Sequence, residues 1–280
     1  MSNLYDVLSG VLLSAFPFVS PLVMLLAGCL GALLYGRIKE PVQSILLRTL
    51  GLLVLLMGCL ELWNGFFVLQ TAQFETQGTV LVIFSLIIGY AFGYAFSLER
   101  VVGQAGEWLF GRFMRPSKPR KSDIIAQAKG QAVRERKTVP PSAEGFMLAS
   151  VLCGFSSTTV FSILDLQMTE DPLPLLLRLG FHALVFFLLT ALFGSSVSFA
   201  VVPVLAVEGV LFLIGTAAGD LITYNLANQL RLVGAVLLLA AGAALGCGKR
   251  VRAARLIPAY LIPLIYGIAS ALIMRLYETA

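Results

Sequence analysis

The chain has 280 residues, of which 58% are hydrophobic and 12% charged, with a mean hydropathy of +0.90. Soluble domains carry about 25% charged residues, so this composition excludes a soluble globular protein and predicts an all-α bundle whose uncharged runs reach the roughly 20 residues that cross a bilayer. The net charge of +5 does not indicate nucleic acid as a partner, because the Lys and Arg residues flank hydrophobic runs, where anionic membrane lipids account for them.

Three predicted crossings occupy the N-terminal part of the chain, at residues 11–35, 49–67 and 79–98. A polar loop without Lys or Arg joins the second crossing to the third. The first run lacks the basic segment that precedes the apolar part of a signal peptide. We therefore expect it to be retained as a membrane-spanning helix.

One long polar segment follows the third crossing. Residues 112–137 contain nine Lys or Arg against only Asp123 and Glu135. Loops rich in Lys and Arg stay on the cytoplasmic side of a membrane. The segment therefore predicts a basic cytoplasmic loop at about residues 112–142, with an amphipathic helix against the inner leaflet.

Five further crossings are predicted after this loop, at residues 145–164, 175–193, 199–218, 232–248 and 256–274. Together with the first three they form a single transmembrane domain over the whole chain, a bundle of about eight helices with both termini outside.

The distribution of positive charge supports this topology. All but three of the twenty Lys and Arg residues fall on the predicted inner side, the exceptions being Arg178, Arg231 and Arg275.

An internal repeat is indicated by two helices that open alike. Arg48 precedes Gly51 by three residues, and Arg231 precedes Gly234 in the same way. A glycine-containing helix precedes each, and the two matched helices run in opposite directions in the predicted topology. This pattern predicts an inverted-topology repeat, although Leu, Gly and Ala runs also resemble one another by composition alone.

Several segments resemble one prokaryotic family. They are AGCLGALLYGRI, SLIIGYAFGYAFSLERVV, FAVVPVLAVEG and RLVGAVLLLAAGAALGCGKR. The chain resembles, over roughly residues 20–264, the domain-of-unknown-function integral membrane family typified by YqgA and YdfK. The resemblance implies a multi-spanning protein of the prokaryotic inner membrane and a transporter role.

Hydroxyl side chains cluster at the centre of the fourth predicted crossing, where Gly154 is followed by Ser156, Ser157, Thr158 and Thr159. Such hydroxyls commonly bond the carbonyl one turn back and bend the helix. The alternative is that they line a substrate pathway. We expect the helix to be irregular here and to face Glu208 across a polar cavity.

Two protonatable residues lie within predicted crossings. Glu208 is near mid-membrane, where a charged side chain costs at least about 2.5 to 3.5 kcal/mol on insertion scales. It needs a partner or a proton, so an ion-coupling role competes with a structural hydrogen bond. His182, the only histidine, suits proton coupling if it faces a cavity, and is otherwise a packing residue.

Secondary candidates are Glu61, Asn64 and Arg178. Glu61 and Asn64 are close to the predicted outer interface, where a wetted helix end explains them. Arg178 is one turn from His182, and its simplest explanation is a salt bridge to the acidic outer loop, at Asp165, Glu170 or Asp171.

The leading functional hypothesis is a secondary transporter or channel for a small solute or ion, with the fourth to sixth crossings lining the route. The alternative is a non-transporting scaffold or lipid-associated protein that acts through its basic loop. The four cysteines never form a C-x-x-C pair, and no nucleophile–base or metal motif occurs. We therefore predict no enzyme, cofactor or metal; the partners are membrane lipids and a small solute or ion, and a homo-oligomer is compatible with the sequence.

Overall fold

The computed structural model of the protein describes residues 19–68, 73–74, 77–98, 100–102, 104, 108, 141–169, 173–217, 223–248 and 253–279. The predicted basic loop, up to residue 140, lies outside the described residues.

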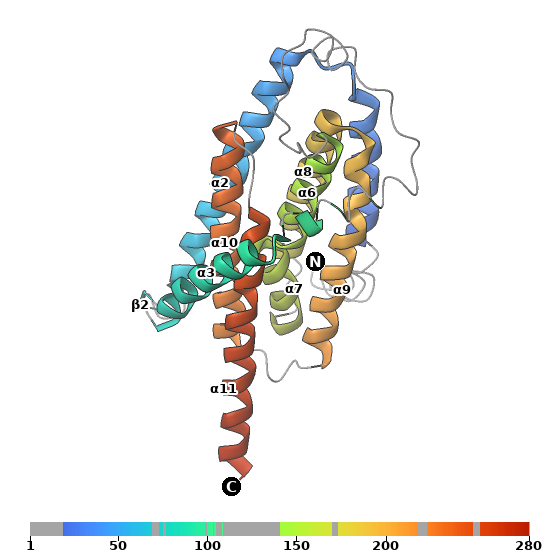
Figure 1. The fold of residues 1–280 in the computed structure, drawn as a ribbon. Helices are drawn as coiled ribbons and strands as arrows, with labels where there is room; N and C mark the ends of the chain where they lie inside the picture. The colour runs from blue at the N-terminus through green and yellow to red at the C-terminus, as the bar shows by residue number, and fades with distance from the viewer. Residues whose placement is uncertain are drawn as a thin grey trace.

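The described residues form an all-α bundle, as predicted (Figure 1). In chain order the elements are the helix Val19–Leu34, α2 (Glu40–Phe66), β1 (Phe67–Val68), β2 (Gln73–Phe74), α3 (Gln77–Ala95), α6 (Pro141–Gly154), α7 (Ser157–Thr169), α8 (Leu173–Phe193), the 3-10 helix η1 (Ser195–Ala200), α9 (Val201–Ala217), α10 (Tyr224–Gly246), the 3-10 helix η3 (Ala253–Tyr260) and α11 (Leu261–Thr279). Within these ranges seven helical stretches are long and apolar enough to cross a membrane, and Val19–Leu34 is a shorter apolar helix.

Several element boundaries differ from the predicted ones, and α2, for example, begins at Glu40 rather than at residue 49. Helix α10 begins at Tyr224 rather than at 232, because Thr223 caps it by accepting a hydrogen bond from the backbone N–H of Leu226 (3.3 Å). Its polar first turns contact other helices instead of forming a loop. The last predicted crossing begins as η3 and continues as α11.

Helices α2 and α10 pack antiparallel along their lengths. A Cβ placed at Gly51 would overlap the backbone of Gly246, and one at Gly65 would meet the side chain of Leu232 at 2.6 Å. Asn228 donates a hydrogen bond to the Gly65 carbonyl at 2.7 Å. Glycine allows this close approach of two helices. The two matched helices are therefore neighbours of opposite direction, while superposition of the two repeat units stays a prediction.

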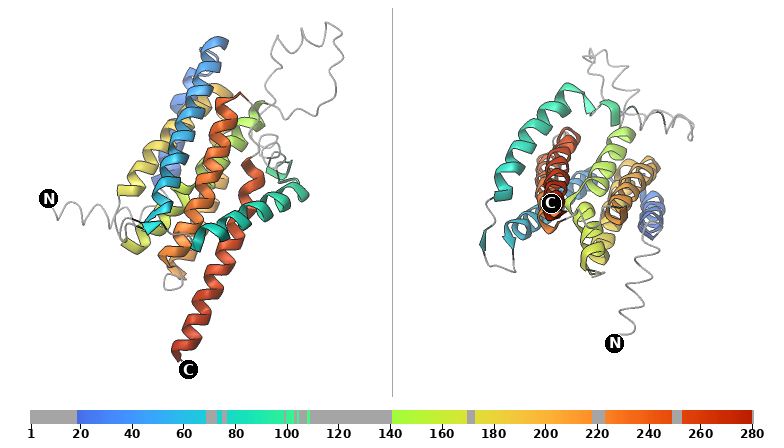
Figure 2. Two further views of the ribbon diagram at one scale, coloured as in Figure 1. Left: turned by 90° about the vertical axis from the view of Figure 1, so that its left-hand side faces the viewer. Right: turned by 90° about the horizontal axis from the view of Figure 1, so that it is seen from below.

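The centre of the bundle is the α6–α7 segment. In an 18-residue window of the span Glu144–Leu166, 94% of the residues are buried, against 22% for the corresponding window of α2 and 28% for that of α3. Figure 2 shows α6 and α7, in green, between α10 and α11 on one side and α9 on the other.

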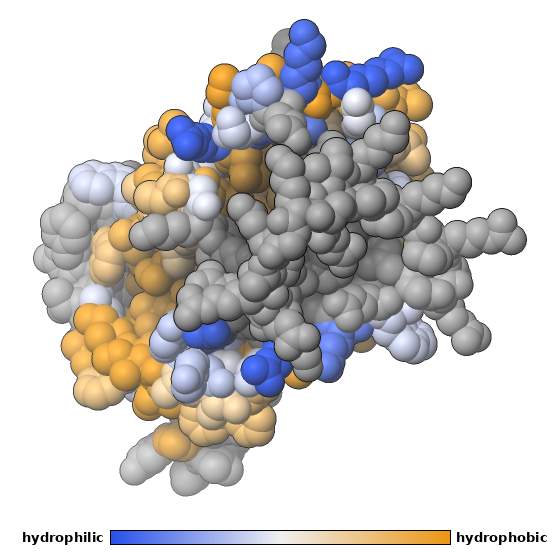
Figure 3. All heavy atoms as spheres, turned by 45° about the horizontal axis from the view of Figure 1, so that its top comes forward, coloured by the Kyte–Doolittle hydropathy of each residue, from blue (hydrophilic) through white to orange (hydrophobic). Residues whose placement is uncertain are grey.

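The outer helices carry exposed hydrophobic side chains, as lipid-facing helices do. Leu52 on α2 is 64% exposed and Ile87 on α3 is 63% exposed. Figure 3 shows such hydrophobic side chains on one flank of the bundle, with hydrophilic ones at the top of the view and again below its centre. The outer helices therefore face the lipid, whereas the buried α6–α7 segment contacts mainly other helices.

Candidate functional site

The central helix is broken inside the bundle. Helix α6 ends at Gly154 and α7 begins at Ser157, which confirms the predicted departure from regular geometry. Ser156 starts the second half, because its Oγ accepts a hydrogen bond from the backbone N–H of Thr159 (3.4 Å), as an N-cap residue does. The Ser156 hydroxyl also bonds those of Thr158 (2.8 Å) and Thr159 (3.0 Å).

Side chains satisfy two carbonyl groups that the break leaves without helical partners. Thr159 Oγ1 donates to the Cys153 carbonyl, and the Tyr260 hydroxyl donates to the Phe155 carbonyl, both at 2.6 Å. Buried carbonyls need such partners, since water does not reach them in the hydrocarbon region. The hydroxyl-rich sequence thus stabilises a break that an apolar sequence would not tolerate.

A buried ion pair lies beside the break. Arg178 Nη2 on α8 is 2.8 Å from Glu208 Oε1 on α9, and the two side chains are 1% and 0% exposed. Arg178 also donates to Ser20 Oγ (3.0 Å) and Ser162 Oγ (3.3 Å), while Ser20 donates to Glu208 (2.9 Å). This pair therefore connects α7, α8, α9 and the helix Val19–Leu34.

This geometry corrects the explanation given for Arg178. It pairs with Glu208, in the bundle interior, rather than only with the acidic outer loop. Of the acidic residues proposed as its partners, Glu170 and Asp171 lie outside the described residues. The side chain of Arg178 reaches both α7 and Glu208, so it fills the place of the predicted polar cavity.

His182 joins the break to the ion pair. Its Nε2 is 3.3 Å from Thr159 Oγ1, and its side chain is completely buried one turn from Arg178. We call the following eight residues the central polar cluster: Ser20, Ser156, Thr158, Thr159, Ser162, Arg178, His182 and Glu208. All are buried.

Sequence reasoning missed Ser20 and Ser162. Ser162 lies one turn after Thr159 on the same face of α7, a spacing that could have indicated it. Ser20, 188 residues from Glu208, has no such signal.

Two residues of the predicted substrate pathway, Gly154 and Ser157, lie outside the cluster. Gly154 packs near Val204 on α9, and the backbone N of Ser157 lies against Gly234 on α10. Ser157 Oγ has no hydrogen-bond partner among the described residues. The break therefore has a polar side toward α8 and a tightly packed side toward α10.

A second ion pair lies on the α10 side of α7. Arg231 Nε is 2.7 Å from Glu61 Oε2, with side chains 11% and 14% exposed. The Arg231 guanidinium also lies 4.0 Å from the centre of the Phe161 ring, a cation–π contact. Glu61 is thus the partner of an arginine rather than an isolated wetted carboxylate, whereas Asn64 is exposed.

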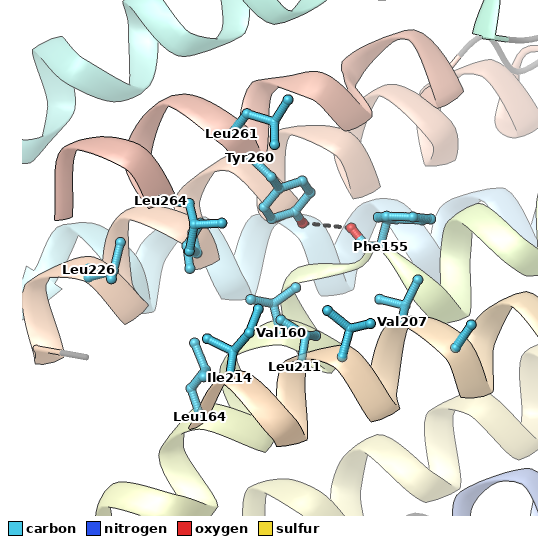
Figure 4. Close-up of a pocket in the computed structure, with 13 residues that line it drawn as sticks. Phe155, Val160, Leu164, Val207, Leu211, Ile214, Leu226, Tyr260, Leu261 and Leu264 are labelled. Carbon is cyan, nitrogen blue, oxygen red and sulfur yellow. Dashed lines mark hydrogen bonds between the residues drawn. The ribbon is translucent and has the colours of Figure 1, made fainter. Parts of the chain in front are cut away.

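The described residues also form an apolar pocket between α7, α9, α10 and α11. It has a volume of about 370 Å³, and Figure 4 shows the residues that line it, with the Tyr260–Phe155 hydrogen bond along one wall. The lining residues are Phe155, Val160, Leu164, Ala206, Val207, Val210, Leu211, Ile214, Leu226, Leu230, Tyr260, Leu261 and Leu264. Glu208 does not line it, and Glu208 meets the broken helix through Arg178, which bonds both Glu208 and Ser162, rather than across this pocket.

The fold and the cluster define a polytopic α-helical membrane protein with a broken central helix and a buried ion pair. The chain belongs to the family described as protein of unknown function (DUF554), whose model matches residues 17–268. This confirms the resemblance noted in the sequence. No curated protein and no solved structure matches the chain.

Proposed function

We propose that this protein is a secondary transporter for a small solute or ion. The observation that carries the proposal is the Arg178–Glu208 ion pair, which lies beside a break in the central helix. Replacing a buried ion pair with apolar residues is often neutral or stabilising. A pair maintained in a membrane interior is therefore better explained by function than by stability.

The break supports the same proposal. Non-helical backbone at membrane depth is tolerated where protein buries it or where it lines a cavity, and transporters commonly build their sites at such discontinuous helices. Here the break lies in the most buried span of the bundle, and its Thr159 hydroxyl contacts His182. A solute bound at the central polar cluster would therefore lie next to the broken backbone.

The enclosure of the cluster favours a carrier over an open channel. Ser20, Arg178, His182 and Glu208 are each at most 1% exposed. A solute reaches them only after helices move, as alternating access requires. The short helix α7 is the candidate moving element. It contacts α8 through Ser162 and α10 through Phe161, so breaking one of these two contacts could release it from one neighbour while it stays attached to the other.

The test is a flux assay with purified protein in liposomes, screened with ions and small metabolites. We expect Glu208→Gln to abolish most of the flux, while Glu61→Gln, the matched change in the other ion pair, keeps it. Normal flux in Glu208→Gln would overturn the proposal. Deletion of residues 116–139 separates the alternative, since a scaffold acting through the basic loop loses its role and a transporter keeps flux.

We also propose that the protein lies in the inner membrane of a prokaryotic cell with its basic loop in the cytoplasm. To test this, a single cysteine replaces Lys129 or Glu75 in a variant that lacks the four native cysteines. Intact cells expressing each variant are then treated with a membrane-impermeant thiol reagent. Position 75 should react and position 129 should not. Labelling at 129 would reverse the topology.

A further inference from the structure

Arg178 and Glu208 differ in one respect that controls their chemistry. Arginine keeps its positive charge at every physiological pH, whereas a carboxylate can take up a proton. Protonation of Glu208 would remove the carboxylate charge that lies 2.8 Å from the buried Arg178 guanidinium. Removing one partner of a buried ion pair is strongly unfavourable, so another anion would gain free energy by taking its place.

We infer that Arg178 is the anion-binding residue of this site, and that a small anion binds there together with one proton carried by Glu208. The inference rests on the proposed function and names its substrate class. Arg178 alternates between two anionic partners, the Glu208 carboxylate and the solute. The proton comes from the aqueous phase that the site faces, forms an O–H bond on Glu208, and leaves when the anion does.

The groups around Arg178 suit a small oxyanion. Its two terminal nitrogens donate to Ser20 and to Ser162 in addition to Glu208. When Glu208 withdraws, a forked guanidinium and two hydroxyls remain, which is the donor set that recognises a carboxylate or a similar anion. Glu208 Oε2 accepts no hydrogen bond from any described residue, so a proton can bind there.

Other titratable groups lie near the ion pair, and experiments must distinguish them from Glu208 as the group that carries the proton. His182 lies one turn along α8, and Cys153 on α6 is within electrostatic range of both charges. Asp165 follows Ser162 by three residues on α7. The variants His182→Asn, Cys153→Ser and Asp165→Asn test whether one of them, rather than Glu208, carries the proton.

The first experiment measures anion binding to the full-length protein in detergent, without transport. Thermal unfolding is followed between pH 5 and pH 8 with sodium chloride, acetate, lactate or phosphate at constant ionic strength. For wild type we expect the affinity for at least one anion to rise as the pH falls, by up to about tenfold per pH unit, the limit for one linked proton.

The variants assign the roles. Glu208→Gln should bind the anion equally at every pH, and anion in the buffer should restore its stability if the protein is otherwise unstable. The double variant Arg178→Gln with Glu208→Gln should fold and bind no anion. Glu61→Gln should keep the wild-type pH dependence. The inference is overturned if wild type binds none of the four anions, binds them independently of pH, or if the double variant still binds.

The second experiment separates the inference from the proposed function. Liposomes containing the protein and a pH-sensitive dye receive the anion that binds. Uptake of anion with acidification of the interior supports both. Proton-linked binding without flux supports the anion site and overturns transport. Flux of a cation or a neutral solute without proton-linked anion binding supports transport and overturns the anion site.

Discussion

Two ion pairs lie on either side of α7, with nearly equal geometry and different surroundings. The nitrogen–oxygen distances are 2.8 Å for Arg178–Glu208 and 2.7 Å for Arg231–Glu61. The first pair is at most 1% exposed, and the second is 11% and 14% exposed. The distances alone therefore say little about how strongly each ion pair interacts, because the strength of the interaction depends on how much solvent screens the charges.

The comparison also assigns each pair to different helices. Arg231 and Glu61 join α10 to α2, with Phe161 of α7 under the guanidinium. Arg178 and Glu208 join α8 to α9, and Ser162 links them to α7. A dry pair on one side and a partly wetted pair on the other hold the same short helix. Separating the dry pair should therefore cost more free energy than separating the partly exposed pair.

The largest effect is expected at the dry pair. Glu208→Gln should lower the free energy of unfolding by about 3 to 5 kcal/mol, because it removes the carboxylate charge 2.8 Å from the buried Arg178 guanidinium. Replacing both residues by methionine should return stability to within about 2 kcal/mol of wild type. Denaturant unfolding in detergent without added small anions measures both. Equal losses in the single and double variants would contradict this account.

The next effect is expected where α10 contacts the break. Gly234→Ala should cost about 1 to 3 kcal/mol by overpacking, because its Cβ would overlap the Ser157 backbone and the Tyr260 hydroxyl. The control is Gly209→Ala on α9, where a Cβ meets nothing within 4 Å. That change should be neutral or slightly stabilising. Similar losses in both variants would show that the contact at Gly234 does not determine the cost.

A smaller loss is expected when one hydrogen bond at the break is removed. Tyr260→Phe leaves the Phe155 carbonyl without the 2.6 Å bond from the hydroxyl and should cost about 1 to 2 kcal/mol. Tyr266→Phe, at an exposed tyrosine of α11, should cost nothing measurable. Thermal unfolding of the two variants side by side provides the measurement, and equal melting temperatures would argue against this hydrogen bond.

The smallest effect is expected at the wetted pair. Glu61→Gln should cost about 1 kcal/mol, the upper end of the range for exposed ion pairs, because the pair is only 11% and 14% exposed, and raised salt should reduce the difference from wild type. A double-mutant cycle with Arg231→Gln measures the coupling energy. A coupling as large as that of Arg178 with Glu208 would remove the distinction between the two pairs.

The sequence by itself determined the class of protein, the approximate number of crossings and the position of the helix break. Hydrophobic length is a property of a contiguous segment, so apolar runs predict crossings before any tertiary contact is known. The break was predictable for the same reason, because Ser156 and Thr159 cap and bond the backbone within a few residues of themselves. Interactions between residues close together in the sequence can be predicted from the sequence.

Only the tertiary structure decided which charges pair and which stay wet. Arg178 was predicted to pair with the nearby acidic loop, yet its partner Glu208 is 30 residues away and its hydroxyl contact Ser20 is 158 residues away. The two residues of the second pair are 170 residues apart. Such contacts depend on how each helix is rotated and on which helix lies beside it. Helix packing sets both, because the partner of a charged residue in a bilayer lies on a neighbouring helix rather than on the same helix.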